Sequence, residues 1–387
     1  MKPNCTSKPK VAILYGGRSI EHEISILTAL QAYSAIDPCR YDVELFYWHP
    51  NGKFYVGEPL YDKGFYRQFD IKEVTEVALN SDPSSRGFWD ACAQKLYPVD
   101  IYFLCFHGQY GEDGCIQGLL ELKQATYTGC NLMASSLSMN KYFCKIVAKE
   151  QGLPVLPQAL VKKREAKNSL QAVQEAILKT PGLETFPLFV KPCHLGSSVG
   201  ISKADDEASL QAALAKVFYF DDEALVEPCL NQLMELNISV LEGEPPVASI
   251  IEMPVSSGSA LSYEDKYLRG GSKETSSQGM ASLTRVIDPA IDPALKQKIA
   301  AHAVKAFSAL GCGGVVRFDF MLDLSSGQLY FNELNPIPGS LSFYLWEAST
   351  PPFLYTEVID HLLERACTRR RRSLSLSRDL GAFKALS

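Results

Sequence analysis

The chain of 387 residues is 46% hydrophobic and 21% charged, which is typical of a globular protein with two or three domains of about 150 residues each. Its net charge of −6 argues against a duplex nucleic-acid binder, because such proteins usually carry a basic face. No segment reaches the roughly 18 apolar residues of a membrane span, and residues 1–10 lack the apolar stretch of a signal peptide. We therefore expect a cytoplasmic protein with neither a membrane nor a nucleic acid as its partner.

Two apolar segments in the N-terminal third are predicted strands that end in glycine-rich loops. A strand over residues 10–15 ends at two glycines, and a helical pattern begins near Glu21. A strand over residues 99–106 ends at His107, which is followed by glycines and acids. In open α/β sheets ligands gather at the carboxyl ends of strands, where glycines let the backbone approach and a helix N-terminus favours anions. The alternative is a pair of tight turns with solvated side chains, and a lone histidine is more often structural than catalytic.

The middle of the chain supplies two lysines and a candidate phosphate loop. Lys141 lies in a helical stretch over residues 133–151, and Lys191 ends a strand that opens into the small-residue loop 194–200. The backbone N–H groups and hydroxyls of such a loop can cradle phosphates, although the lysine precedes the loop and the pattern is not a Walker motif. The alternative is a flexible hairpin tip. Glu227, at the end of a further strand, could accept a hydrogen bond from an adenine amino group or a ribose hydroxyl.

A segment near the C-terminal end predicts a β-hairpin that carries a metal site. Two runs rich in β-forming residues flank a short turn centred on Ser326, and symmetric folding would place Asp319 opposite Glu333. It would also place Arg317 opposite Asn335, and because side chains alternate along a strand, all four would share one face. Two carboxylates and an amide oxygen suit Mg²⁺ (or Mn²⁺), bound through few protein ligands plus substrate phosphates. The alternative is the ordinary polar face of an amphipathic hairpin.

The remaining segments give weaker signals. Residues 262–284 are polar and glycine-rich, which is the profile of a mobile loop over a site. A last packed helix is predicted over residues 353–366. Beyond it, a run of four arginines and a serine-rich end predict a disordered, solvated tail over residues 367–387. Residues 51–85 follow no clear pattern.

Seven motifs resemble those of the D-alanine–D-alanine ligases, within the ATP-grasp superfamily. They are G-G-R-S-I-E-H-E-I-S (16–25), H-G-Q-Y-G-E-D-G (107–114), Y-T-G-C-N-L-M-A-S-S-L-S-M-N-K (127–141), V-K-P-C-H-L-G-S-S-V-G (190–200), E-D-K-Y-L (264–268), R-F-D (317–319) and N-E-L-N-P-I-P-G (332–339). They occur in the family's order and cover about residues 10–363. One motif would prove little, but seven in order make coincidence implausible.

The resemblance implies an α/β fold with α+β character in its ATP-grasp part. An N-terminal open parallel α/β sheet over residues 1–130 would bind substrate. Two further α+β domains, a central one over 131–240 and a C-terminal one with the metal site over 241–366, would hold ATP between their sheets. The tail over 367–387 would follow, and a homodimer is implied as well.

The resemblance also implies the reaction. ATP would phosphorylate the carboxylate of one D-alanine, and the amine of a second would displace the phosphate, giving D-alanyl-D-alanine for peptidoglycan precursors. Glu21 would hold the first ammonium in a hydrogen-bonded trio with Ser197 and Tyr267, and Arg317 would donate to the oxyanion of the tetrahedral intermediate.

The other site residues follow from the same motif match. ATP and its phosphates would be bound by Lys141, Lys191, Ser198, Glu227, Glu235 and Lys266. The two small amino acids would be bound by Glu21, His107, Arg317, Gly339, Ser340 and Tyr344. The metal ligands would be Asp319, Glu333 and Asn335.

The sequence departs from the family pattern on the acceptor side. Tyr344 stands where the family has a serine that helps to bind the carboxylate of the acceptor, and Pro228 stands where a lysine is common. The acceptor could therefore be D-serine, D-lactate or another amine instead of D-alanine. From a different class, the chain could be a nucleotide-binding module without turnover.

Overall fold

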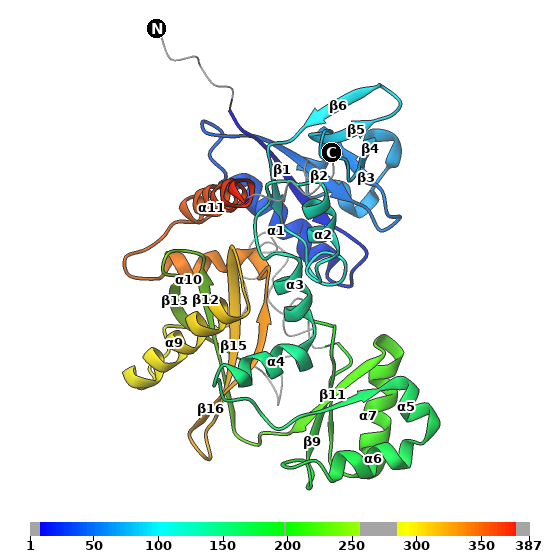
Figure 1. Ribbon diagram of the computed structural model, residues 1–387, viewed down its shortest axis with the longest axis vertical. Coiled ribbons are helices and arrows are strands. Elements are labelled where there is room, and N and C mark those ends of the chain that lie inside the picture. The colour runs from blue at the N-terminus through cyan, green and yellow to red at the C-terminus, as the bar shows by residue number, and fades with distance from the viewer. Residues whose placement is uncertain (1–7, 197–198, 256–284, 377–387) are drawn as a thin grey trace, which may run out of the picture.

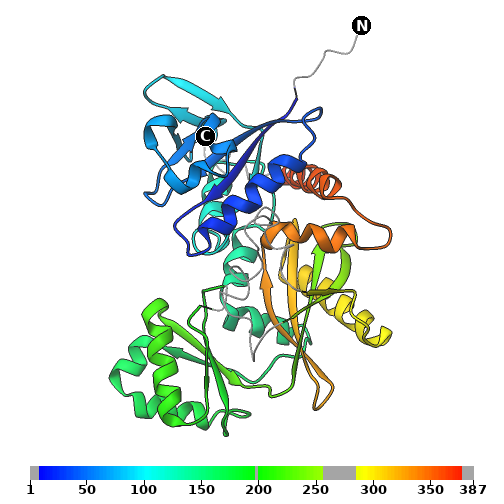
Figure 2. The same cartoon turned by 180° about the vertical axis from the view of Figure 1, so that it is seen from behind.

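The computed structural model describes residues 8–196, 199–255 and 285–376, and in them the chain forms three blocks, each built on a sheet with its own apolar core (Figure 1). The blocks follow one another along the molecule, with the N-terminal sheet at one end (Figure 2). The predicted α/β fold class is confirmed. Among the described residues, no helix combines the length and apolarity that crossing a membrane requires.

The first block is a seven-stranded mixed sheet in the order β6-β5-β4-β3-β2-β1-β7. Its strands are β1 Lys10–Gly16, β2 Asp42–Trp48, β3 Phe54–Val56, β4 Thr75–Leu79, β5 Gly87–Asp90, β6 Lys95–Pro98 and β7 Ile101–Leu104. Its helices are α1 His22–Ala35, α2 Cys115–Leu122 and α11 Tyr355–Ser375, with 3₁₀ turns at Glu58–Tyr61, Phe65–Gln68 and Ile71–Glu73. β1 is apolar and almost wholly buried, as a central strand with covered faces requires.

This first sheet is parallel at one end only. β2, β1 and β7 run parallel, as predicted, whereas the pairs from β2 out to β6 are antiparallel. β3 and β4 arise from residues 51–85, which follow no clear sequence pattern, and β5 and β6 come directly after them. They are only three to five residues long, which is too short for a periodic signal to stand out.

The second block is a four-stranded antiparallel sheet in the order β10-β9-β11-β8. Its elements are β8 Ala159–Lys162, α5 Lys163–Asn168, α6 Leu170–Leu178, β9 Leu188–Pro192, β10 Ser202–Ala204, α7 Glu207–Phe220 and β11 Glu223–Pro228. α7 begins where the Asp206 side chain accepts a hydrogen bond from the Ser209 N–H, and it packs against β9, β10 and β11. One face of the sheet is therefore covered, and the other is left for the cleft described below.

The third block is a five-stranded antiparallel sheet in the order β14-β13-β12-β15-β16. Its strands are β12 Leu233–Leu241, β13 Val247–Pro254, β14 Arg285–Ile287, β15 Val315–Asp323 and β16 Gln328–Asn335. Its helices are α3 Leu132–Met139, α4 Lys141–Glu150, α9 Pro293–Ala309 and α10 Phe343–Glu347, with a 3₁₀ turn over Gly339–Ser342. The Asn140 side chain caps α4 by accepting from the Phe143 N–H at 3.1 Å, which sets Lys141 at the first turn of this helix.

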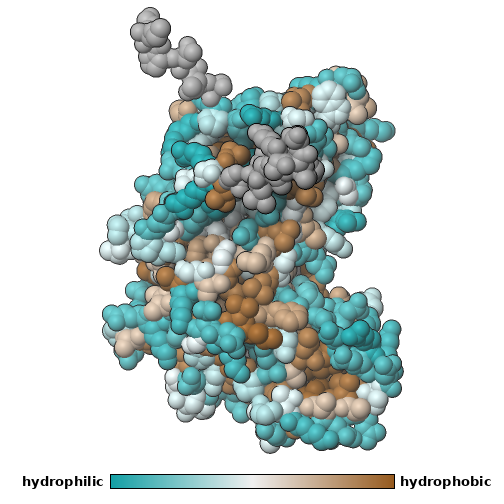
Figure 3. All heavy atoms as spheres, viewed as in Figure 1, coloured by the Kyte–Doolittle hydropathy of each residue, from teal (hydrophilic) through white to brown (hydrophobic). Residues whose placement is uncertain are grey.

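The three cores combine segments that are distant in the sequence. α3, α4 and β12 belong to the core of the five-stranded sheet, and α11 returns to the core of the N-terminal sheet. The domain boundaries at residues 130, 240 and 366 stay predictions. Residues on both sides of 130 and of 240 pack in the same apolar core, and α11 continues through residue 366. On the face shown in Figure 3, apolar surface extends from the middle of the molecule onto the four-stranded block, as is common around ligand clefts.

The predicted disordered tail is wrong for residues 367–375, which form the last turns of α11. Arg365 and Arg369 pair with Glu242, and Arg372 pairs with Glu244, in the connection between β12 and β13. Arg365, Arg369 and Arg372 therefore share the face of a helix that ties the N-terminal block to the five-stranded sheet. Residues 377–387 lie outside the described residues.

We predict that Glu242→Ala destabilises the fold more than Glu244→Ala. Glu242 is buried, lies 3.3 Å from Arg365 Nε and accepts a hydrogen bond from the Gly314 N–H at 2.7 Å. Its loss would leave two guanidinium groups without this partner and lower the free energy of unfolding by about 2 kcal/mol, after allowing for their partial exposure. Glu244 is exposed, so its loss should cost less than about 0.5 kcal/mol. Equal urea midpoints for the two variants would contradict the role given to Glu242.

Candidate active site

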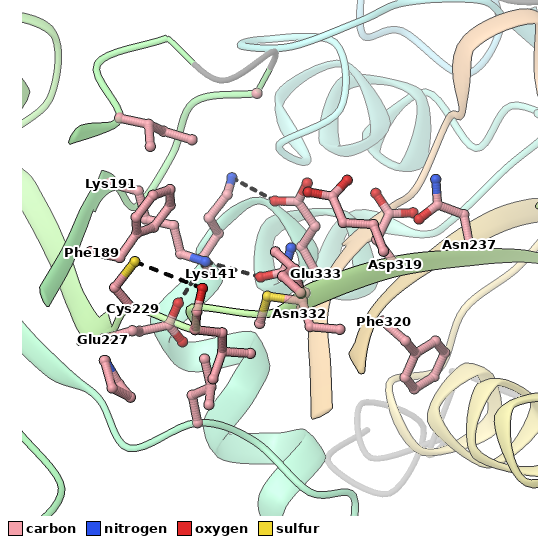
Figure 4. Close-up of a pocket in the computed structure, with 18 of the residues that line it drawn as sticks. Lys141, Phe189, Lys191, Glu227, Cys229, Asn237, Asp319, Phe320, Asn332 and Glu333 are labelled. Atoms are coloured by element: carbon pink, nitrogen blue, oxygen red, sulfur yellow. Dashed lines mark hydrogen bonds and ion pairs between the residues drawn. The ribbon is translucent and has the colours of Figure 1, made fainter. Parts of the chain in front are cut away.

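A cleft between the four-stranded and five-stranded sheets gathers most of the charged residues that the motifs single out (Figure 4). Its predicted members are Lys141, Lys191, Glu227, Glu235, Asp319 and Glu333. Apolar and neutral side chains complete the walls, among them Phe189, Cys229, Asn237, Phe320 and Asn332. Lys191 and Glu227 reach the cleft from the four-stranded sheet, and Asp319 and Glu333 reach it from the five-stranded sheet.

The β15–β16 hairpin has the predicted register at its acidic residues. Asp319 pairs with Glu333, and Arg317 pairs with Asn335. The next pair toward the turn is Phe320 with Phe331, so Asn332 is an extra residue, a β-bulge. The bulge lets Asn332 and Glu333, which are neighbours in the chain, both line the cleft.

Arg317 and Asp319 form a two-pronged ion pair on this hairpin. Arg317 Nε donates to Asp319 Oδ1 at 2.7 Å and its NH2 donates to Oδ2 at 2.8 Å, while Asn335 Nδ2 donates to the same Oδ2 at 3.2 Å. Burial alone would lower the pKa of Arg317, but the adjacent Asp319 carboxylate outweighs it and holds that pKa well above its ordinary value. A permanently charged guanidinium therefore lies beside the predicted metal ligands.

The predicted metal ligands suit a hard cation only with help from a substrate. Asp319 and Glu333 offer carboxylate oxygens and Asn335 an amide oxygen, which are the donors that Mg²⁺ takes. Within residues 8–196, 199–255 and 285–376, no three His, Cys, Asp or Glu side chains are grouped closely enough to hold a metal by themselves. Such a donor set fits a cation that arrives with phosphates as its other ligands.

Two lysines extend across the cleft. Lys141 Nζ donates to the Leu195 carbonyl at 2.7 Å and lies 3.4 Å from Glu333 Oε2. Lys191 Nζ lies 2.6 Å from Glu227 Oε2 and donates to Asn332 Oδ1 at 3.0 Å. Lys191 thereby links the two sheets, since Glu227 and Asn332 belong to different sheets.

A third lysine, which sequence reasoning missed, lies behind Glu227. Lys145 of α4 is fully buried and its ammonium contacts Glu227 Oε1. Burial lowers the pKa of Lys145 to about 8 despite the favourable effect of Glu227. Burial would raise the pKa of Glu227, but Lys145 and Lys191 outweigh it and keep that pKa below its ordinary value. The signal was present in the sequence, because Lys145 follows Lys141 by four residues and shares its helix face.

On the N-terminal side, Glu21 meets the small-residue loop of the four-stranded block. A Cβ atom placed on Gly196 would lie 3.0 Å and 3.1 Å from the two carboxylate oxygens of Glu21, so a larger residue at 196 would crowd this carboxylate. The predicted trio of Glu21 with Ser197 and Tyr267 is not tested, because both partners lie outside the described residues. The same holds for Ser198, Lys266 and the predicted mobile loop over 262–284.

Two buried side chains hold the segment that follows β16 against the N-terminal block. Glu112 accepts hydrogen bonds from the N–H groups of Gly108 at 2.6 Å and Ile337 at 3.0 Å. Burial raises the pKa of Glu112 well above its ordinary value, and Glu21 adds to the effect. His107 contacts Thr28 Oγ1 through Nε2 at 2.8 Å and also bonds to the backbone of Ile337.

These contacts involve or lie next to three residues that are predicted to bind substrate, namely His107, Gly339 and Ser340. Burial lowers the pKa of His107 to about 3, so this side chain is neutral at physiological pH. Thr28 Oγ1 also accepts from the N–H of Ser340, in the 3₁₀ turn that begins at Gly339, at 3.2 Å. His107 thus holds this turn in place through Thr28. Its direct contact with a substrate stays a prediction.

Tyr344 takes part in a polar cluster that sequence reasoning did not foresee. Its hydroxyl donates to Glu252 Oε1 at 3.3 Å, and the Arg285 guanidinium lies 4.2 Å from the centre of its ring. Arg285 also pairs with Glu252 at 2.6 Å, and Asn237 Nδ2 donates to Glu252 at 3.1 Å. The cluster fixes the tyrosine ring near Arg317, whose pKa Tyr344 and Glu252 help to raise.

Comparison with known proteins gives one consistent result. The family models described as D-ala D-ala ligase N-terminus and D-ala D-ala ligase C-terminus match residues 10–130 and 147–364. The D-alanine–D-alanine ligase of Thermosipho africanus is 34% identical over 357 residues, which is 92% of each chain. That of Ruminiclostridium cellulolyticum is 34% identical over 379 residues, covering 94% of this chain and 96% of the relative.

Solved structures agree with these relatives. The D-alanine–D-alanine ligase from Coxiella burnetii superposes with a TM-score of 0.77 at 25% identity, covering 95% of this chain and 97% of that chain. The VanG D-Ala:D-Ser ligase from Enterococcus faecalis superposes with a TM-score of 0.76 at 26% identity, covering 93% and 99%.

We predict that Thr28→Val destabilises the protein more than Thr28→Ser does. Valine leaves His107 Nε2 and the Ser340 N–H without their shared hydroxyl in a buried place, which should lower the free energy of unfolding by about 1–3 kcal/mol. Serine keeps the hydroxyl and should cost less than about 1 kcal/mol. Urea denaturation measures both values, and a valine variant as stable as the serine variant would show that the hydroxyl contributes little.

Proposed function

The chain belongs to the D-alanine–D-alanine ligase family, and we propose that it joins two D-alanines to D-alanyl-D-alanine while converting ATP to ADP and phosphate. One observation carries the proposal: the cleft between two sheets is lined by two lysines and by the carboxylates of Asp319 and Glu333, with the Arg317 guanidinium bound to Asp319, on a chain that is similar to these ligases over almost its whole length. The product would enter peptidoglycan precursor synthesis.

The nucleotide would occupy this cleft in the manner of the ATP-grasp superfamily. Lys141 and Lys191 would neutralise the phosphates, because their ammonium groups already lie in the cleft among acceptors. Glu227 and Glu235 would accept hydrogen bonds from the adenine amino group and the ribose. A divalent cation, magnesium or manganese, would be held by Asp319, Glu333 and Asn335 and would neutralise further phosphate charge.

The chemistry would proceed in two steps. A carboxylate oxygen of the first D-alanine, whose ammonium Glu21 would hold, attacks the terminal phosphorus of ATP, and ADP leaves. The amine of the second D-alanine then attacks the carbonyl carbon of the acyl phosphate, and Arg317 would donate to the oxygen that becomes negative. Collapse of this tetrahedral intermediate forms the amide bond and releases phosphate. Ser197, Ser198, Lys266 and Tyr267 would complete the site by motif match.

We expect Asp319→Asn to lower kcat/KM for ATP, measured by the release of ADP, by about 100-fold. The substitution removes one charge from the proposed metal site. It also weakens the two-pronged ion pair that orients Arg317. Asp323→Asn is the matched control, since Asp323 lies on the same strand but caps the exposed hairpin turn. Its kcat/KM should stay within about twofold of the wild-type value. Unchanged activity in Asp319→Asn would remove the proposed role of this face of the hairpin.

Tyr344 bears on the identity of the acceptor, which is the second substrate of the proposed reaction. The cluster of Tyr344, Glu252 and Arg285 lies where the family pattern places a serine for the acceptor, and one structurally similar enzyme is a D-Ala:D-Ser ligase. We propose D-alanine as acceptor because the curated relatives similar over most of the chain are D-alanine–D-alanine ligases. D-serine, D-lactate and other amines are the alternatives.

A substrate panel separates these acceptors. We expect D-alanine alone to stimulate ADP release and to yield D-alanyl-D-alanine by mass spectrometry. Turnover that needs D-alanine together with D-serine or D-lactate would assign the chain to a different acceptor. A chain that binds ATP and releases no ADP with any member of the panel would be a nucleotide-binding module.

The proposal also covers the oligomeric state and the cellular location of the protein. We propose a homodimer in the cytoplasm, supported by family membership. Sedimentation equilibrium at micromolar concentration should give twice the chain mass of 42.8 kDa. A mass of one chain at the concentration used for activity would contradict the dimer without affecting the reaction.

A further inference from the structure

One buried carboxylate in the nucleotide cleft has two lysine partners. Glu227 is 1% exposed and lies between Lys191, 2.6 Å from its Oε2, and Lys145, which contacts its Oε1. The two lysines differ in position. Lys191 lines the cleft and reaches Asn332 across it, whereas Lys145 is fully buried in α4 on the far side of Glu227.

A buried carboxylate needs only one cation to balance its charge. Removing one partner of a buried ion pair costs several kcal/mol, because the remaining charge is left in a medium that solvates it poorly. If Lys191 were the only cation beside Glu227, a phosphate could attract it only by leaving that carboxylate unpaired. A second lysine on the other oxygen removes this cost.

We propose that Lys145 is a positioning residue that keeps Glu227 paired and so leaves Lys191 available to the nucleotide phosphates. The inference rests on the proposed function, in which Lys191 binds those phosphates. Lys145 itself does not line the cleft among the described residues, so it would touch neither nucleotide nor amino acid. It acts through Glu227, by holding the carboxylate after Lys191 has turned toward a phosphate.

The test measures how much the phosphates contribute to nucleotide binding. The dissociation constants of ATP and of adenosine are measured by calorimetry at a fixed Mg²⁺ concentration, and their ratio isolates the phosphate contribution from the base contacts. In Lys145→Met, Lys191 stays paired with Glu227, and we expect the preference for ATP over adenosine to fall about 30-fold. Lys149→Met, an exposed lysine one turn further along α4, is the matched control and should keep the wild-type ratio.

A second variant distinguishes this role from a general disturbance of the core. Neutralising the carboxylate as well, in Lys145→Met/Glu227→Gln, frees Lys191 and should restore the ratio to within about threefold of the wild-type value. A merely structural lysine would not show this rescue. Should Lys145→Met fail to fold, Glu227→Gln and the double variant are compared, and their ratios should be equal because Lys145 has no carboxylate left to hold.

The outcomes separate the inference from the proposed function. Lys191→Met should itself abolish most of the preference for ATP, and an unchanged ratio there would overturn the nucleotide site and this inference together. With that site intact, a wild-type ratio in Lys145→Met would overturn the inference alone. So would an equal loss of ATP and adenosine affinity, or a lower ratio in the double variant than in Glu227→Gln.

Discussion

The structure depends on the pairing of charges that two facing sheets bury between them. Lys191 of the four-stranded sheet pairs with Glu227 on its own sheet and donates to Asn332 on the other, and Lys141 of α4 pairs with Glu333 and donates to the Leu195 carbonyl across the cleft. Each of these groups would be costly to bury alone, so the sheets are held at the separation that satisfies them. The same separation leaves a cleft whose two walls carry both lysines and carboxylates, which suits a polyanion that arrives with a metal ion.

The N-terminal block is fixed to this cleft by hydrogen bonds from the backbone and by ion pairs. Glu112 accepts from the backbone of Ile337, Thr28 accepts from the backbone of Ser340, and Glu242 binds the arginines of α11. The turn that these contacts hold is strained, since residues 340–342 have φ angles of 53°, 52° and 52° without being glycines. Several contacts with neighbouring groups together can hold such a backbone in place. Strain of this kind is common at ligand sites.

The sequence predicts those parts of the site that local patterns control. The pairing of Asp319 with Glu333 follows from the symmetry of the hairpin about its turn, but the bulge at Asn332 depends on packing that the pattern does not contain. Lys145 was missed because a lysine inside a helix is usually solvated, and its partner Glu227 lies 82 residues away. The sequence pattern places Arg369 and Arg372 in a tail because it does not contain their distant partners, and Glu242 lies 127 residues from Arg369.

A crystal structure with ADP, Mg²⁺ and a phosphinate analogue of the tetrahedral intermediate tests the central claim most directly. The claim predicts the nucleotide between the two sheets, Asp319 and Glu333 on the metal, and Lys191 on a phosphate oxygen while Lys145 remains on Glu227. A nucleotide bound outside this cleft, or carboxylates of the β15–β16 hairpin turned away from it, would contradict the claim.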